Sequence, residues 1–253
     1  MLNNYDHSFV QKNGRQIFVQ TKIDRDFGTR LHNRILRAWK PPSFFYHLQP
    51  GGHLAAVRAH LPNNFFLYAD LERFYDSISR TRIHRALKKI GWSQSDAWKT
   101  ACRSTVKKSK AKEAYCLPFG FVQSPILASV VLATSAFGAA IQMISAKGIA
   151  ISIYIDDVFV SSDDVSELIV VQNELMIAVA TAGFSFGSAK KSDPSPSADL
   201  FNLNISNNSM ALTSRRIAEF VDALKTANPA RREGILSYVK NINKNQYDIV
   251  SKI

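Results

Sequence analysis

The hydrophobic pattern of the chain contains two apolar segments that each carry aspartate at or near an end. Residues 63–71 (NNFFLYADL) and 149–161 (IAISIYIDDVFVS) are rich in β-branched and aromatic residues, which favour strands. Asp156 and Asp157 interrupt the second segment and predict the tip of a hairpin within it. We therefore expect a strand and a hairpin with carboxylates at their ends.

Helices are expected where apolar residues recur at helical spacing. Ser79 or Thr81 can cap a helix that Gly91 ends, and Asp164 begins a second apolar helix that Gly183 ends. The elements expected afterwards are a short strand at 184–186, a hairpin of 200–205 with 210–213, a helix capped by Thr213, and a basic helix near 230–243. This order predicts an α+β fold with a mainly antiparallel sheet.

Residues 124–146 contain no charged side chain and are long enough to span a bilayer. The segment also carries Pro125, Gln142 and several Ser and Thr residues, and a charged, strand-like segment follows it soon afterwards. We predict a buried helix and no membrane association, with a membrane span as the alternative.

The chain carries 32 Lys and Arg against 20 Asp and Glu, a formal net charge of +12. Such a positive field suits binding to a polyanion such as nucleic acid. The alternative is that the positive charge only keeps the protein soluble. Cys102 and Cys116 lack CxxC spacing, so we expect two buried thiols and neither zinc nor a disulfide framework. His53 and His60 lack metal-binding partners and are expected to be structural. The cysteine usage and the polar N-terminus, without a secretory signal, favour a cytoplasmic protein.

The carboxylates of Asp70, Asp156 and Asp157 converge if the predicted strand and hairpin lie side by side. Carboxylates on rigid elements are ligands that Mg²⁺ prefers. Two divalent ions about 3.5–4 Å apart stabilise the charge that develops when a nucleotide is joined to a 3′-hydroxyl. The alternative is ordinary cap and turn chemistry, in which Asp is common. The pattern therefore raises nucleotidyl transfer as a hypothesis.

Four ordered segments resemble the motifs of one enzyme family. Residues 67–78 (LYADLERFYDSI) resemble the first palm motif of reverse transcriptases, and Tyr154-Ile155-Asp156-Asp157 resembles their YxDD box. Between them, residues 117–125 (LPFGFVQSP) are similar to the LPxGxxxSP motif of the family, and residues 183–190 (GFSFGSAK) match the Gly-to-Lys motif that follows the box. The predicted 200–213 hairpin stands where the family has its primer grip.

The resemblance implies a right-hand polymerase fold with fingers, a palm of antiparallel sheet flanked by helices, and a short helical thumb. The implied parts are residues 1–62 with part of 79–115 as fingers, 63–213 as palm and 214–253 as thumb. The implied activity is RNA-directed DNA polymerisation with dNTPs, an RNA template, a DNA product, and Mg²⁺ or Mn²⁺. With so short a thumb, we expect a structured non-coding RNA or a partner protein to complete the duplex clamp.

Within the family, the compact chain is most similar to bacterial retron, abortive-infection and defence-associated enzymes, because no RNase H, maturase or integrase extension is visible. That similarity implies a role in anti-phage defence. The alternatives are untemplated or protein-primed DNA synthesis on the same palm, a non-catalytic nucleic-acid-binding subunit, and a palm-fold nucleotide cyclase. The LPxGxxxSP-like segment argues against the cyclase.

By the same resemblance, Asp70 and Asp156 ligate both metal ions and Asp157 is a nearby third carboxylate. Tyr75 takes the place of the steric gate that excludes a ribose 2′-hydroxyl. A core aromatic is the alternative for Tyr75 and the expectation for Phe74.

The remaining implied contacts lie in several segments. Backbone amides from Leu71 to Phe74 would cradle the triphosphate, which Arg15 or Lys22 would grip. Lys190 would assist the leaving pyrophosphate, with the neighbouring lysine or a solvated charge as alternatives. The other implied nucleotide contacts are Phe119, Gly120 and Gln123, and the implied template or primer contacts are Ser124, Pro125 and Tyr154. Because the family often has Gln where this chain has Phe119, we expect altered handling of the sugar.

Overall fold

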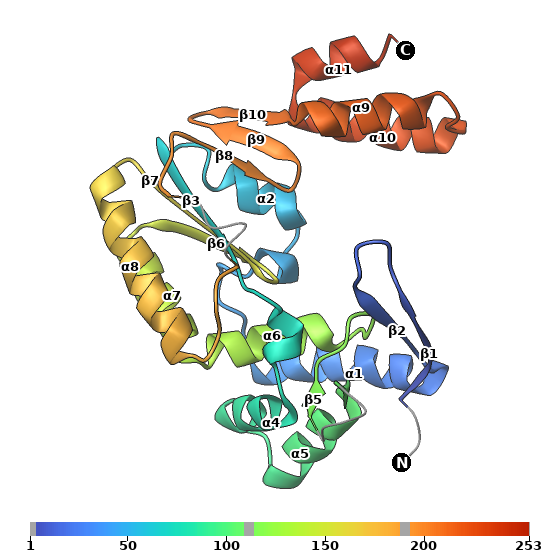
Figure 1. Ribbon diagram of the computed structural model, residues 1–253, viewed down its shortest axis with the longest axis vertical. Helices are drawn as coiled ribbons and strands as arrows, with labels where there is room; N and C mark the ends of the chain where they lie inside the picture. Colours follow the sequence, from blue (N-terminus) through green and yellow to red (C-terminus); the bar gives the residue numbers. More distant parts are fainter. Residues whose placement is uncertain (1–3, 109–113, 188–192, 253) are drawn as a thin grey trace.

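A central antiparallel sheet organises the fold, and the computed structural model describes residues 4–108, 114–187 and 193–252 around it (Figure 1). The strands, in spatial order, are β3 (Phe65–Asp70), β7 (Asp157–Ser162) and β6 (Ala150–Tyr154). Both predicted strand segments are confirmed, with one difference at the hairpin tip. Tyr154 pairs with Asp157 across a two-residue turn, so Ile155 lies in the turn and Asp157 belongs to β7.

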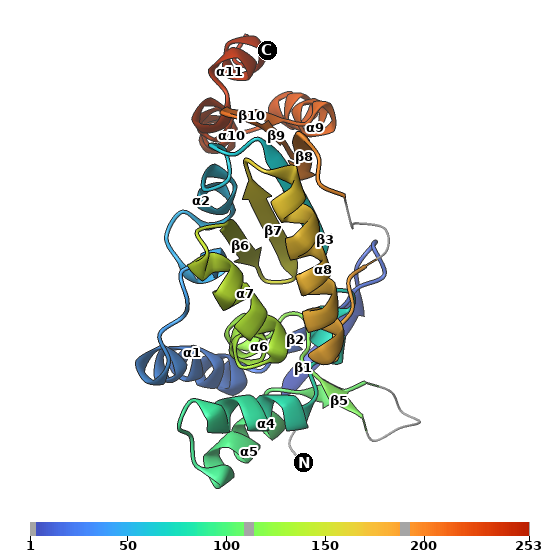
Figure 2. The ribbon, with the colours of Figure 1, turned by 90° about the vertical axis from the view of Figure 1, so that its left-hand side faces the viewer.

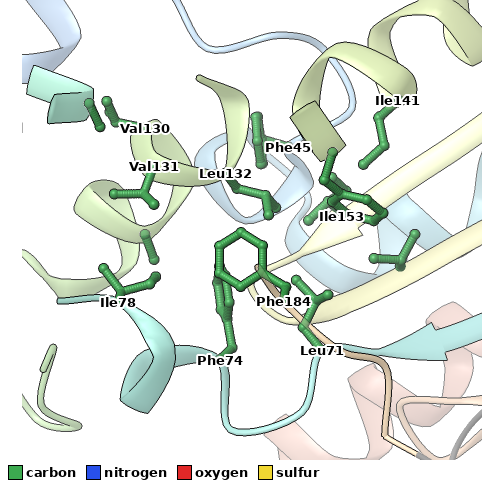
Figure 3. Close-up of a cluster of buried hydrophobic side chains, with 14 of the residues drawn as sticks. Phe45, Leu71, Phe74, Ile78, Val130, Val131, Leu132, Ile141, Ile153 and Phe184 are labelled. Carbon is green, nitrogen blue, oxygen red and sulfur yellow. The ribbon is translucent and has the colours of Figure 1, made fainter. Parts of the chain in front are cut away.

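Side-chain alternation places two hydrophobic cores on opposite faces of this sheet. Leu67 and Val160 belong to the larger core, whereas Phe66 and Phe159 belong to the second. Three helices accompany the larger core, namely α6 (Ser124–Ala133), α7 (Ala136–Ala146) and α8 (Val165–Thr181) (Figure 2). Figure 3 shows Phe74 converging with side chains of α6 and of the sheet, so the larger core reaches the end of β3.

The charge-free segment 124–146 forms two helices rather than the single buried helix predicted. The axes of α6 and α7 are bent by 74°. Ser135 causes the break, because its extended backbone ends α6 and its hydroxyl accepts the amide hydrogen of Gly138 as the N-cap of α7. Among the described residues, no single helix has the length and apolar composition of a membrane span, although this bent pair meets both criteria together.

Several elements were not predicted from the hydrophobic pattern. They are β1 (Tyr5–Val10), β2 (Gln16–Gln20), α1 (Lys22–Ala38), the 3-10 helix η1 (Tyr46–Leu48), α2 (Gly52–Arg58), α3 (Phe74–Ser77), α5 (Gln94–Arg103), β4 (Val106–Lys107) and β5 (Tyr115–Cys116). The predicted caps Ser79 and Asp164 are confirmed as the N-caps of α4 (Arg80–Lys89) and α8. The strand predicted at 184–186 is wrong, because Phe186 makes only an isolated bridge with Leu71.

The C-terminal hairpin predicted from sequence is a three-stranded meander. Its strands are β8 (Ser197–Leu200), β9 (Leu203–Ser206) and β10 (Ser209–Leu212). Phe201 and Asn202 both have left-handed backbone, with φ of 54° and 63°, and close the additional turn. Thr213 caps α9 (Ser214–Leu224) as predicted, and α10 (Pro229–Ile242) and α11 (Lys244–Val250) follow. The boundaries between fingers, palm and thumb stay a prediction.

His60, which follows α2, is fully buried against β6 and β7. Its Nδ1 atom lies 2.7 Å from Ser161 Oγ and its Nε2 atom lies 2.9 Å from Ser152 Oγ. The ring also packs edge-on against Phe159. Burial lowers the pKa of His60 to about 3, because the charged ring would lose its hydration. The histidine is therefore neutral in the fold and serves a structural purpose.

We predict that His60 makes the protein less stable in mild acid. Its folded pKa lies below the ordinary value of 6.5, so its stabilising contribution is complete above pH 6.5 and is lost as the pH falls toward 3. Between pH 7 and pH 4.5 the contribution of His60 to the free energy of unfolding falls by about 2–3 kcal/mol. Urea unfolding of the wild type and of His60→Gln at both pH values measures this, and equal pH dependence in the two proteins would contradict it.

Candidate active site

Strand pairing gathers three aspartates at one end of the central sheet. Asp70 is the last residue of β3 and lies directly opposite Asp157, the first residue of β7. Directly opposed residues share a face of the sheet, so these two side chains are neighbours. Asp156 lies in the turn, where its carbonyl oxygen accepts the amide hydrogen of Leu71 at an N···O distance of 2.9 Å. This bond fixes the turn against the end of β3.

A cavity of about 290 Å³ lies beside the aspartates. Its lining residues are Arg15, Asp70, Phe74, Tyr75, Phe119, Ile155, Asp156 and Asp157. All of them except Ile155 were candidate site residues in the sequence. The fold therefore brings candidates from four distant segments to one cavity.

An aromatic wall closes the side of the cavity nearest the β1–β2 hairpin. The ring centroids of Tyr75 and Phe119 are 4.7 Å apart, and Arg15 Cζ lies 4.3 Å from the centroid of the Phe119 ring. The second distance is typical of a cation–π interaction. Burial raises the pKa of Tyr75, the charge of Asp156 adds to that effect, and Arg15 opposes it. The Tyr75 hydroxyl is therefore protonated at neutral pH.

The β1–β2 hairpin reaches this wall because residue 120 is glycine. The amide of Phe18 in β2 donates a hydrogen bond to the carbonyl oxygen of Phe119 at an N···O distance of 2.9 Å. Gly120 has a φ of 98°, and a Cβ atom there would lie 2.3 Å from the carbonyl oxygen of Phe18. Any side chain would both strain the backbone and displace β2. Gly120 thus supports the cavity through β2 and does not line it.

Asp157 is held by Tyr68, which stands two residues before Asp70 on the same face of β3. The Tyr68 hydroxyl donates a hydrogen bond to Oδ1 of Asp157. Burial raises the pKa of Tyr68, and the charge of Asp157 and this hydrogen bond add to the effect. A neutral hydroxyl therefore orients the carboxylate of Asp157.

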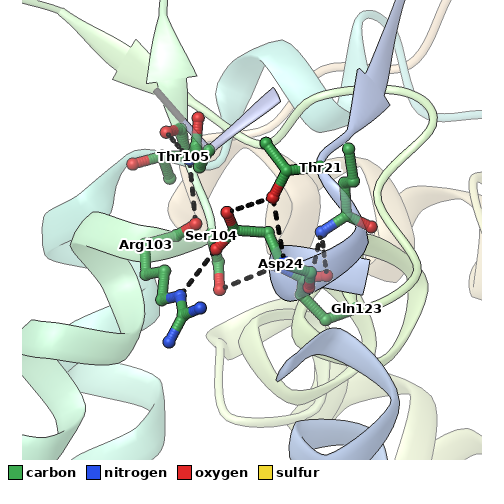
Figure 4. Close-up of polar contacts among 8 residues, drawn as sticks. Thr21, Asp24, Arg103, Ser104, Thr105 and Gln123 are labelled. Atoms are coloured by element: carbon green, nitrogen blue, oxygen red, sulfur yellow. Dashed lines mark hydrogen bonds and ion pairs between the residues drawn. The ribbon is translucent and has the colours of Figure 1, made fainter. Parts of the chain in front are cut away.

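Gln123, a candidate nucleotide contact, does not line the cavity. Its side chain is fully buried, where Oε1 accepts a hydrogen from Gln20 Nε2 at 3.1 Å and Nε2 donates to Ser104 Oγ at 3.4 Å. Figure 4 shows this network beside the ion pair between Asp24 and Arg103, whose Oδ1 and Nε atoms are 2.6 Å apart. The network joins α1 to the start of α6, so Gln123 positions helices rather than contacting the cavity.

Other sequence candidates also lie outside the cavity lining. Ser124 is buried and donates its hydroxyl hydrogen to a backbone carbonyl, and Pro125 is in the first turn of α6. Lys22 is exposed at the start of α1, and Tyr154 packs in an aromatic cluster beyond the turn. Lys190 lies outside the described residues.

Two of the four amides predicted to cradle a triphosphate are engaged elsewhere. The amide of Leu71 donates to Asp156, and the amide of Glu72 donates to the carbonyl oxygen of Ser185 at 2.8 Å. The amides of residues 73 and 74 stay candidates, at the point where a left-handed backbone leads into α3.

Two residues at the turn were not predicted from the sequence. Ile155 lines the cavity with a left-handed φ of 63°, and its amide donates to Nδ1 of His47 at 3.1 Å. Ile155 stands between Tyr154 and the aspartates, at the variable position of the YxDD motif, and His47 lies in a segment without helical or strand periodicity. Only the folded chain brings them together.

The donor chemistry at the cavity suits a hard cation such as Mg²⁺, because three carboxylates surround it. In the part of the chain that the structure describes, no three His, Cys, Asp or Glu side chains are close enough to form a metal-binding group.

The fold resembles those of solved polymerases. The foamy viral protease-reverse transcriptase in complex with an RNA/DNA hybrid aligns with 97% of this chain at a TM-score of 0.51 and 15% identity, and 30% of that chain is covered. The same viral protein in complex with dsDNA aligns with 97% of this chain at a TM-score of 0.51 and 17% identity, with 46% of that chain covered. This chain thus spans less than half of either structure. The predicted reverse transcriptase fold is confirmed.

Sequence comparison also points to reverse transcriptases, here as a family. A search of curated proteins found no match. The family model described as "Reverse transcriptase (RNA-dependent DNA polymerase)" matches residues 7–195, which is well over half of the chain and includes every residue that lines the cavity. The chain therefore belongs to the reverse transcriptase (RNA-dependent DNA polymerase) family.

Proposed function

We propose that the chain catalyses RNA-templated DNA synthesis at the cavity beside the three aspartates. The observation that carries this proposal is the arrangement of Asp70, Asp156 and Asp157 around a cavity that Arg15 and Tyr75 also line. Negative groups for metal ions and a positive group for phosphate thus share one cavity. Membership of the family supports the same chemistry.

In this proposal, Asp70 and Asp156 hold two divalent ions, and Asp157 is the third carboxylate. Such ions, when bound, stabilise the charge on the attacking oxygen, the phosphorus and the leaving pyrophosphate. Arg15 binds the triphosphate, because its guanidinium forms charge-assisted hydrogen bonds with phosphate oxygens. The hydrogen bond from Tyr68 keeps the carboxylate of Asp157 pointed to the same site.

We predict that Asp156→Ala lowers DNA synthesis by about a thousandfold or more while the fold survives, because the charge stabilisation would be lost. Primer extension on an RNA template with dNTPs and Mg²⁺, together with thermal unfolding, measures both. Asp222→Ala is the matched control, because the side chain of Asp222 is 75% exposed on α9 and does not line the cavity. An active Asp156→Ala protein would overturn the proposal, and an inactive wild type would favour the non-catalytic nucleic-acid-binding subunit.

Tyr75 is proposed as the steric gate against ribonucleotides. Its ring is buried at the cavity wall and packs against the ring of Phe119, so it cannot easily move aside. A 2′-hydroxyl pressed against this wall would also be desolvated without a partner.

We predict that Tyr75→Val lowers the preference for dNTPs over rNTPs by about tenfold to a hundredfold, because the ring no longer fills the space beside the sugar. Tyr75→Phe keeps the ring and is expected to keep the preference. Single-nucleotide incorporation kinetics with dNTP and rNTP pairs measure the ratio, and an unchanged preference in Tyr75→Val would rule out this role.

Phe119 favours untemplated or protein-primed synthesis as a second candidate. Its ring contacts both Tyr75 and Arg15, and a phenylalanine side chain has no group that could hydrogen-bond an incoming sugar. Sequencing the product made on a defined template separates the two candidates, because a complementary product excludes untemplated synthesis.

We also propose, on the motif resemblance alone, that the protein acts in the bacterial cytoplasm in anti-phage defence, with a structured RNA or partner protein completing its clamp. We predict that bacteria expressing the wild type resist at least some phages and that cells expressing Asp156→Ala do not. Plating efficiency of a phage panel on both strains measures this, and equal plaque numbers throughout would refute it.

A further inference from the structure

His47 connects the turn that carries Asp156 to helix α6. The ring lies in η1, where its Nδ1 atom is 3.1 Å from the amide nitrogen of Ile155 and its Nε2 atom is 2.7 Å from Ser129 Oγ. Ser129 in turn donates its hydroxyl hydrogen to the carbonyl oxygen of Pro125 at 2.9 Å. A continuous chain of hydrogen bonds therefore runs from the turn to the first turn of α6.

The hydrogen-bond donors in this series determine which ring nitrogen of His47 carries the hydrogen. Ser129 has one hydroxyl hydrogen, which it gives to Pro125, so toward His47 it can only accept. The Nε2 atom of His47 must then be the donor, which leaves a lone pair on Nδ1 of the neutral ring for the amide of Ile155. Burial lowers the pKa of His47 to about 4 and outweighs the opposing effect of the backbone at Ile153, so the ring is neutral near pH 7.

The hydrogen bond that His47 accepts comes from the amide of Ile155, whose backbone is strained. Ile155 has a φ of 63°, a conformation that β-branched side chains rarely adopt and that is retained only where neighbouring structure enforces it. Its side chain packs beside the larger core and lines the cavity. Asp156 follows immediately, and its carbonyl oxygen is held by the amide of Leu71. The peptide unit before Ile155 and the peptide unit after Asp156 are thus anchored by separate partners.

We propose that His47 is a positioning residue that holds Ile155 in its left-handed conformation and thereby directs Asp156 into the cavity. The inference rests on the proposed polymerase function, because it assigns a purpose to the orientation of Asp156. The ring is itself held in place by edge-on contacts with Phe45 and Tyr154. His47 touches no reacting atom and acts only through the turn.

Two substitutions separate the hydrogen bond from the bulk of the side chain. His47→Asn places a carboxamide oxygen near the position of Nδ1 and can still accept the amide of Ile155. His47→Gln places its carboxamide near Nε2, where it can bond Ser129 but cannot accept that amide. We expect kcat to fall about tenfold or more in His47→Gln and to stay within about threefold of the wild type in His47→Asn.

In both variants we expect the KM for the RNA–DNA template-primer to stay unchanged, because His47 does not face the duplex in this proposal. His84→Gln is the control, since His84 lies on α4 against Trp98 and away from the turn. Equal kcat in His47→Gln and wild type would overturn the proposal. A loss of kcat in His47→Asn as large as that in His47→Gln would also overturn it.

Nuclear magnetic resonance tests how His47 positions Ile155 without an activity measurement. We expect the Nε2–H tautomer of His47, and amide exchange at Ile155 that is about tenfold faster in His47→Gln than in His47→Asn. An Nδ1–H tautomer, or equal exchange in the two variants, would overturn the positioning. If the wild type makes no DNA but the tautomer and exchange follow expectation, the polymerase proposal fails and the structural link through His47 stands.

Discussion

The pairing of Asp70 with Asp157 across β3 and β7 is the constraint on which the site depends. Side chains of a strand alternate between faces, so a slip of one residue would turn Asp157 away from Asp70. Such a slip is costly because both faces of the sheet are buried. Phe66 and Phe159 stack with parallel rings 6.0 Å apart in one core, while Val160 packs in the other. The two cores thus determine the register that brings the carboxylates together.

The cavity also depends on contacts that reach across the chain. Gln20 at the end of β2 donates to Gln123 and accepts the amide hydrogen of Val122, which ties the β1–β2 hairpin to the segment before α6. The backbone bond between Phe18 and Phe119 extends this attachment toward the cavity. Arg15, just before β2, therefore reaches the cavity from a hairpin that is anchored at several points.

The sequence predicted the parts of the fold that have local signals. Asp164 and Thr213 have the side-chain chemistry of N-caps, and the strands around the aspartates have clear β composition. The 124–146 segment has no charged residue and its Ser and Thr residues are scattered along it, so the sequence did not single out Ser135 as the point of a break. Helix α1 was missed because its buried face includes Asp24, whose burial depends on an ion pair with Arg103, 79 residues away.

For the candidate site, the sequence predicted most residues that line the cavity but also named residues that lie outside it. Apart from Arg15, the residues that line the cavity belong to the motifs at 67–78, 117–125 and 154–157. Gln123 shares a motif with Phe119 but faces inward to Gln20 and Ser104. Spacing along a motif cannot show whether a side chain points to the cavity or into the protein interior. The partnership of His47 with Ile155 joins residues 108 positions apart and depends on a left-handed backbone that no residue preference indicates.

The stacking of Arg15 on Phe119 has a consequence for how such a site can change over generations. One ring supports both the guanidinium and Tyr75, so a mutation at position 119 alters the surroundings of two other cavity residues at once. Residues in contact have non-additive effects on stability and function. A protein with glutamine at this position would lose the aromatic support of Arg15 in the same step. Substitutions at positions 15, 75 and 119 therefore have coupled effects, and each residue limits which substitutions the others tolerate.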